Sequence, residues 1–220
     1  MFETPSVEIL LIKAMVLAVM LLVAFPIHEF SHALAAFQLG DGTARLMGRL
    51  TLDPRAHFDP TGGLLLAISV LLTPFGFGWA KPTPYNPFNL RGGRWGEAIV
   101  AVAGPISNLV LATAAAIPLR YIDMAGMSVP LLEAFLDFFV IINLVLMVFN
   151  LIPIPPLDGS KVLFAFMSPR TAMQVRPVLE QYGILILFGA LLLPIFGGST
   201  LIDVVFTELL APIYRLLTGR

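Results

Sequence analysis

Residues 7–39 read VEILLIKAMVLAVMLLVAFPIHEFSHALAAFQL, and this stretch decides the class of fold. From residue 7 to residue 25 it is nearly free of charge, and hydrocarbon is crossed by about 20 apolar residues in a helix. It ends at Gly40-Asp41-Gly42, a helix terminator followed by turn residues. The sequence therefore predicts a helix that crosses a membrane and continues beyond it.

The composition of the whole chain indicates a membrane protein. Apolar residues make up 58% of the 220 residues, charged residues make up 12%, and the mean hydropathy is +0.90. A soluble domain has about 25% charged residues. The apolar segments lie at about 5–39, 62–79, 96–119, 129–152, 184–196 and 201–217. We expect an all-α polytopic membrane protein with about five to six transmembrane segments.

The same composition excludes several classes of function. A net charge of −1 gives no reason to expect a nucleic-acid partner. The chain has no cysteine, which excludes disulfides, cysteine-ligated zinc and thiol catalysis. Any bound metal must therefore be held by histidine and carboxylate.

The most specific motif is H-E-x-x-H at residues 28–32. On a helix, His28 and His32 project from one face and can bind one Zn²⁺, while Glu29 can act as a general base toward metal-bound water. A core histidine that only hydrogen-bonds a neighbour is the alternative. That alternative is weak here, because ionisable groups within an apolar segment are costly unless they are paired or bound to metal.

A catalytic zinc needs a third protein ligand and one position for water. The best candidate is Asp158, which follows the proline-rich exit of the fourth apolar segment in N-L-I-P-I-P-P-L-D-G, residues 150–159. Prolines stiffen this exit and leave carbonyls without helical partners, which at membrane depth favours a wet cavity. The alternative is a plain loop with a surface aspartate. His57 could instead complete the site, or belong to a structural network with Asp53 and Asp59.

These paired motifs resemble the site-2 protease family of intramembrane zinc metalloproteases, in its small form without PDZ or CBS domains. Further blocks with the same resemblance are G-R-L-T-L-D-P at 48–54, G-F-G-W-A-K-P at 76–82 and A-G-P-I-S-N at 103–108. The resemblance covers residues from about 20 to about 165. It implies one Zn²⁺ held by His28, His32 and Asp158, with Glu29 as general base.

The implied function is hydrolysis of peptide bonds within or near transmembrane segments of membrane proteins. Asn108 and Asn150 are expected to hydrogen-bond the substrate backbone or the developing oxyanion, with interhelical hydrogen bonding as the alternative. The expected partners are a transmembrane protein or peptide substrate, the lipid bilayer and a regulatory membrane protein. We expect a single membrane-embedded domain over residues 1–220, with a core at 5–165 and a C-terminal helical hairpin at about 178–217.

Residues 75–87 are rich in glycine and proline and suit an extended segment beside the site. A helical substrate must unwind before its carbonyls can be attacked, and this segment could pair with it as an added strand. Gly76, Phe77, Gly78 and Trp79 are therefore candidate substrate-binding residues. The alternative is a connecting loop, with Trp79 and Tyr85 at the level of the lipid headgroups.

The distribution of positive charge predicts the orientation. If 62–79 re-enters the membrane rather than spanning it, segments 40–60, 81–95, 153–183 and the C-terminal tail share one side. That side then carries 11 of the 13 lysines and arginines, and under the positive-inside rule it is cytoplasmic. We expect a multi-pass cell-membrane protein with its N-terminus outside, its C-terminus in the cytoplasm and its active site toward the cytoplasm.

Two rival classes differ in the pattern they require. A metal transporter would distribute its ligands along a pathway and would not need Glu29. A catalytically silent protein of the same fold would be expected to lack Glu29 or a ligand. The clustered and complete set favours the protease.

Overall fold

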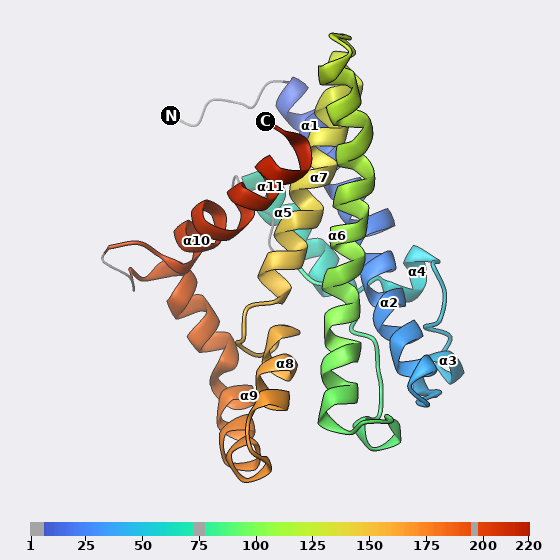
Figure 1. The fold of residues 1–220 in the computed structure, drawn as a ribbon, viewed down its shortest axis with the longest axis vertical. Coiled ribbons are helices and arrows are strands. Elements are labelled where there is room, and N and C mark those ends of the chain that lie inside the picture. Colours follow the sequence, from blue (N-terminus) through green and yellow to red (C-terminus); the bar gives the residue numbers. More distant parts are fainter. Residues whose placement is uncertain (1–6, 73–77, 195–197) are drawn as a thin grey trace.

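The computed structural model describes residues 7–72, 78–194 and 198–220, and every secondary-structure element in these ranges is a helix (Figure 1). Four helical stretches are long and apolar enough to cross a membrane: Leu11–Gln38, Arg94–Met124, Pro130–Asn150 and Pro169–Leu192. A shorter apolar helix covers Pro60–Val70. The chain is therefore a multi-pass helical membrane protein, as its sequence predicts.

The first span is one rod built from three parts. Helix α1 (Val7–Val19) continues into η1 (Met20–Ala24), a π-helical turn, and then into α2 (Phe25–Gln38). Pro26 lacks a backbone N–H, and the wider π-turn lies directly before it. Gly40 has a φ of +109° and ends the rod, as the sequence predicts.

Helix α6 (Arg94–Met124) is the central element. It packs against α2, α7 (Pro130–Asn150) and α8 (Gly159–Phe166), and Figure 1 shows it running the length of the molecule. Its buried face is rich in small residues, which let neighbouring backbones approach closely. These residues are Ala98, Ala101, Gly104, Ala112, Ala115 and Ala116.

A group of short elements joins α2 to α6. They are α3 (Thr43–Leu46), α4 (Pro54–His57), α5 (Pro60–Leu72) and η2 (Pro87–Asn89). After α5 the chain comes back to its starting point, because the Lys81 N–H donates to the His57 carbonyl at 2.8 Å. A Cβ at Gly62 would lie 2.2 Å from the Trp79 carbonyl oxygen, so the returning chain touches the first turn of α5.

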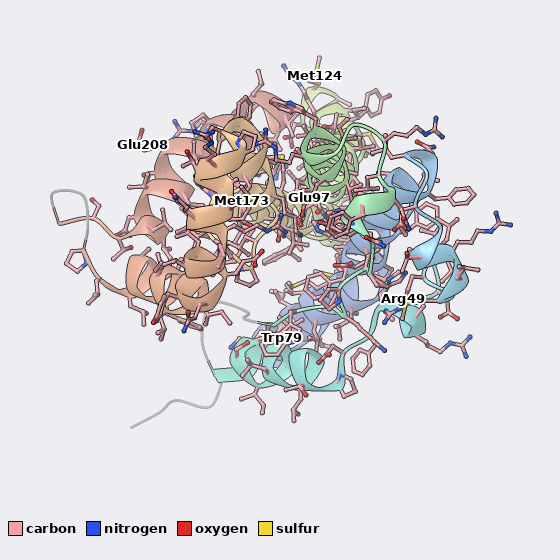
Figure 2. The ribbon with its side chains drawn as sticks, turned by 90° about the horizontal axis from the view of Figure 1, so that it is seen from below. Arg49, Trp79, Glu97, Met124, Met173 and Glu208 are labelled. Carbon is pink, nitrogen blue, oxygen red and sulfur yellow. The ribbon has the colours of Figure 1, made fainter. Side chains whose placement is uncertain are left out.

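Helix α9 (Pro169–Leu192) begins well before the apolar segment expected at 184–196. Its first half carries charges that conceal it from a hydropathy pattern. Arg176 forms a bidentate pair with the buried Glu97 of α6, with N–O distances of 2.9 and 3.0 Å. Figure 2, which looks along the long axis, shows Glu97 in the crowded interior. The ion pair therefore ties α9 to α6 next to the α8 region.

The C-terminal tail lies at an unexpected place. After α9, helix α10 (Leu201–Val204), η3 (Val205–Leu210) and α11 (Ala211–Thr218) continue toward the end where α6 meets α7 (Figure 1). There Arg220 pairs with Asp123 at 2.7 Å and with Glu133 at 3.5 Å. This corrects the expectation that the tail shares a side with segments 40–60, 81–95 and 153–183. The chain continues in one direction because η3 packs against α7 and α11 packs against both α6 and α7.

Candidate metal centre

His28, His32 and Asp158 come together in the interior, within the part of the chain that the structure describes. Their ligand atoms lie within 4.8 Å of one another, and the three residues are 6%, 6% and 7% exposed. The two Nε2 atoms are 3.0 Å apart. Asp158 Oδ2 lies 3.3 Å from His28 Nε2 and 3.1 Å from His32 Nε2. The structure thus brings together three residues that come from the two motifs.

Local structure explains how each of the three residues reaches this point. His28 and His32 are one helical turn apart on α2, which packs against α6. Asp158 occupies the position before the first residue of α8, at the end of the proline-rich loop. A Cβ at Gly159 would lie 2.1 Å from the Leu151 carbonyl oxygen, so the loop folds tightly back on itself. Only glycine at 159 fits this close turn.

Hydrogen bonds orient both imidazole rings. His28 Nδ1 lies 2.6 Å from Asn108 Oδ1, and His32 Nδ1 lies 2.7 Å from the Val100 carbonyl oxygen. Both partners are oxygen acceptors, so each Nδ1 carries the proton and each Nε2 keeps its lone pair. Outer partners of this kind are typical of metal-binding histidines.

With both rings neutral, two Nε2 lone pairs and one carboxylate oxygen thus face one point. Two neutral imidazoles and a carboxylate are a donor set that zinc accepts, with one position left for water or substrate. Gly104 of α6 borders the same point: a Cβ there would lie 2.4 Å from His32 Nε2 and 2.6 Å from His28 Nε2. The missing side chain leaves room for an ion, so the residues fit a bound zinc.

Glu29 is held by a residue from the loop after α5. Its Oε2 accepts a 2.7 Å hydrogen bond from the Thr83 N–H, and the Thr83 hydroxyl donates to the Glu29 carbonyl at 2.9 Å. Thr83 lies between Pro82 and Pro84, which have no backbone N–H. The single main-chain donor of residues 82–84 is therefore used to orient Glu29.

Asp158 has a second partner that the sequence reasoning missed. Lys161 Nζ donates to Asp158 Oδ1 at 3.0 Å, so the other oxygen, Oδ2, faces the histidines. The sequence could have indicated this pair, because Lys161 lies three residues after Asp158 at the start of a helix, and side chains at that spacing are neighbours. Thr83 and Asn143 were also missed. An asparagine inside an apolar span is unusual, and this signal applies to Asn143 as much as to Asn108.

The remaining sequence-predicted residues have other surroundings. Asn150 donates to the Leu146 carbonyl of its own helix at 2.9 Å. His57 Nε2 lies 2.8 Å from the Thr51 carbonyl oxygen, and its buried Nδ1 has no partner in the described structure. A Cβ at Gly78 would lie 2.4 Å from Leu66, so this residue packs against α5. The candidate substrate-binding residues Gly76 and Phe77 lie outside the described residues.

Comparisons with known proteins agree with this geometry. The profile of Peptidase family M50 matches residues 116–194. The protein named "Putative zinc metalloprotease YwhC" of Bacillus subtilis is 35% identical over 184 residues, which cover 81% of each chain. "Putative zinc metalloprotease Rip2" of Mycobacterium tuberculosis is 32% identical over 178 residues, covering 80% of this chain and 66% of the relative. No solved structure matches the chain significantly.

The identity to YwhC extends over four fifths of both proteins. The structure brings the two sequence motifs together at one buried point. The chain therefore belongs to peptidase family M50, the site-2 protease family of membrane-embedded zinc metalloproteases.

Proposed function

We propose that this protein hydrolyses peptide bonds in membrane-protein substrates, with zinc held by His28, His32 and Asp158 and with Glu29 as general base. The observation that carries the proposal is the meeting of two Nε2 lone pairs and one carboxylate oxygen at a buried point beside Gly104. Without a cation, these atoms would repel one another in a medium of low dielectric constant.

The residues around this point divide the chemical work. When bound, zinc acts as a Lewis acid that polarises the scissile carbonyl and makes water acidic enough to attack near neutral pH. Thr83 holds Glu29 Oε2, which leaves Oε1 to take the proton from the attacking water and pass it to the leaving amine. Membership of a zinc peptidase family supports this assignment over a metal transporter or a silent protein.

We also propose that substrate pairs with Gly76, Phe77, Gly78 and Trp79 rather than with the whole of 75–87. Residues 81–84 have no main-chain N–H to offer, because Lys81 and Thr83 use theirs internally and the other two residues are prolines. Through Thr83, this part of the loop instead holds Glu29 in place. Asn150 remains a candidate for contact with the substrate backbone.

The proposed topology is a single membrane-embedded domain in which α5 is re-entrant. Its 13 residues are too few to cross about 30 Å of hydrocarbon, and Lys81 returns to His57 next to its start. With this element included, the chain has five to six membrane-embedded segments. Nine of the 13 lysines and arginines lie in segments 40–60, 81–95 and 153–183, so we place the active-site end in the cytoplasm and both termini outside.

The decisive experiment measures zinc content and cleavage of a generic transmembrane substrate in detergent. We expect wild type to hold one zinc and cut, Glu29→Gln to keep zinc without cutting, and Asp158→Ala to lose zinc. Cleavage by Glu29→Gln at the wild-type rate would refute the mechanism. A wild-type protein that binds no zinc would refute the site.

Orientation can be tested by cysteine labelling, since the native chain has no cysteine. Met47 and Met127 are exposed residues on loops at the two ends of the molecule. In intact cells an impermeant maleimide should label Met127→Cys and leave Met47→Cys unlabelled. The reverse pattern would place the active-site end outside.

A further inference from the structure

Asn143 is a fully buried amide on α7 that the chemistry described above does not use. It belongs to a chain of three hydrogen bonds that ends at the metal centre. The Asn143 Nδ2 donates to the Phe139 carbonyl at 2.9 Å, and Asn108 Nδ2 donates to Asn143 Oδ1 at 3.0 Å. Asn108 Oδ1 then faces His28 Nδ1 at 2.6 Å. Asn108 and Asn143 are both 0% exposed, so water does not compete for these bonds.

We propose that Asn143 is a positioning residue that holds Asn108 with its oxygen toward His28, and thereby keeps the metal-facing Nε2 of His28 unprotonated. This inference rests on the proposed function, because it concerns the same zinc ligands.

The direction of every hydrogen bond in this chain follows from the member farthest from the metal centre, the Phe139 carbonyl. The Phe139 carbonyl can only accept, so Asn143 must present its NH₂ group there and its oxygen to Asn108. Asn108 must then present its NH₂ group to Asn143 and its oxygen to His28. An acceptor beside His28 Nδ1 requires a proton on that nitrogen, and the neutral ring then has its lone pair on Nε2.

Reversal of Asn108 would break this order at two points. Its oxygen would face the oxygen of Asn143, and its NH₂ group would face His28 Nδ1. His28 would then favour the tautomer with a proton on Nε2, where zinc must bind. Buried polar groups without partners are costly at low dielectric constant, so the chain through Asn143 disfavours the reversal.

The second histidine provides an internal contrast. His32 Nδ1 faces the Val100 carbonyl directly, and a backbone carbonyl in a helix cannot rotate to present a donor. A side-chain amide such as Asn108 can rotate by 180°. His28 therefore needs Asn143 to fix its tautomer, whereas His32 needs only the backbone of α6.

The test is the zinc dissociation constant of the purified full-length protein, measured by competition with a chelator. We expect Asn143→Leu to bind zinc about tenfold more weakly than wild type, within the range for outer-shell partners. Thr113→Val is the matched control, because Thr113 lies on α6 and its hydroxyl also donates to a carbonyl four residues earlier, that of Leu109. It should bind zinc as wild type does. If Asn143→Leu does not fold, Asn143→Ala tests the same prediction.

A rescue variant separates a positioning role from a merely structural one. A carboxylate has two acceptor oxygens and no NH₂ group, so Asn108→Asp should restore zinc affinity in the Asn143→Leu background. In ¹⁵N-histidine spectra of the metal-free protein, His28 should be the Nδ1–H form in wild type and a mixture in Asn143→Leu. The chain has only three histidines, which makes the assignment simple.

The outcomes distinguish this inference from the proposed function. Wild type that binds zinc while Asn143→Leu binds it equally well would overturn the inference alone. A double variant that binds no better than Asn143→Leu would also overturn it. Wild type that binds no zinc at all would overturn the proposed function.

Discussion

The metal centre and the C-terminal end of the molecule both hold carboxylates in elements that pack against α6, and they balance charge in different ways. At the C-terminal end, Arg220 pairs with Asp123 and Glu133, and its side chain is 32% exposed. At the metal centre, His28, His32 and Asp158 are buried and direct three electron pairs at one point. The first group carries its own cation and is complete within the protein. In the second group Lys161 balances only Oδ1 of Asp158, so Oδ2 and the two Nε2 atoms still face a point that an added cation would complete. This difference separates a structural cluster from a functional one.

The largest effect is expected from closing the space at the metal centre. Gly104→Ala places a methyl group 2.4–2.6 Å from both Nε2 atoms, which removes the room for an ion. Zinc affinity should therefore fall by more than about 100-fold, which exceeds the loss expected when a residue that hydrogen-bonds a zinc ligand is removed. Zinc content per protein, measured by atomic absorption, checks this. Gly189→Ala is the control, because no atom lies within 4 Å of its added methyl group. If the Gly104→Ala protein held one zinc tightly, the space beside Gly104 would not be the place where the ion binds.

The next effect concerns the neutral donor that orients Glu29. Thr83→Pro removes the N–H that binds Glu29 Oε2, and loss of positioning at a catalytic group costs about 100-fold in turnover. Zinc content should stay at the wild-type level. Thr83→Ala keeps the N–H and should lose far less activity. Equal turnover of the proline and alanine variants would show that this contact does not matter.

Asp41 offers a carboxylate balanced by neutral donors rather than by a cation. Thr43 Oγ1, Asn89 Nδ2 and the Asn86 N–H donate to it at 2.7, 2.9 and 2.9 Å, and these bonds join the end of α2 to the loop before α6. Burial alone would raise the pKa of the Asp41 carboxyl, but these bonds hold it below the ordinary value of 3.8.

The lowered pKa sets the sign of the pH dependence. Asp41 contributes stability that is complete above the unfolded-state pKa and is lost as the pH falls through the lower folded-state value. Asp41→Asn should reduce the free energy of unfolding by about 1–3 kcal/mol at pH 7 and should weaken the acid sensitivity. Thermal unfolding in detergent between pH 3 and pH 7 measures both. If Asp41→Asn lost as much thermal stability between pH 7 and pH 3 as wild type does, the acid sensitivity would belong to other groups.

The smallest effect on stability is expected from the C-terminal cluster, which consists of Arg220, Asp123 and Glu133. Its ion pairs are partly exposed, so Arg220→Ala should lower the free energy of unfolding by only about 0.2–1 kcal/mol and less at high salt. Zinc affinity and turnover should not change, because the cluster lies at the other end of α6. A change in zinc affinity in Arg220→Ala would mean that the two groups are coupled and would end the distinction between them.

Much of the site was predictable because its ligands belong to two short motifs. His28, Glu29 and His32 follow from helical spacing within one segment. Asp158 was a candidate because of its proline-rich loop, and the resemblance to the site-2 protease family implied that it is the third ligand. Asn108 was expected at the site, and in the structure its Oδ1 contacts His28 Nδ1. Thr83, Lys161 and Asn143 were not predicted, because their roles depend on which segments pack together.

The sequence by itself determined the membrane-spanning helical class, the zinc-binding motif and the residue types available for a metal. These features depend on local hydrophobicity and on spacing along one helix, which are properties of neighbouring residues. Tertiary structure alone decided that α10 and α11 continue to the α6–α7 end, that Gly104 leaves room for an ion and that Asn143 reaches His28 through Asn108. These features depend on contacts between residues far apart in the chain, and such contacts arise only when the helices pack around α6.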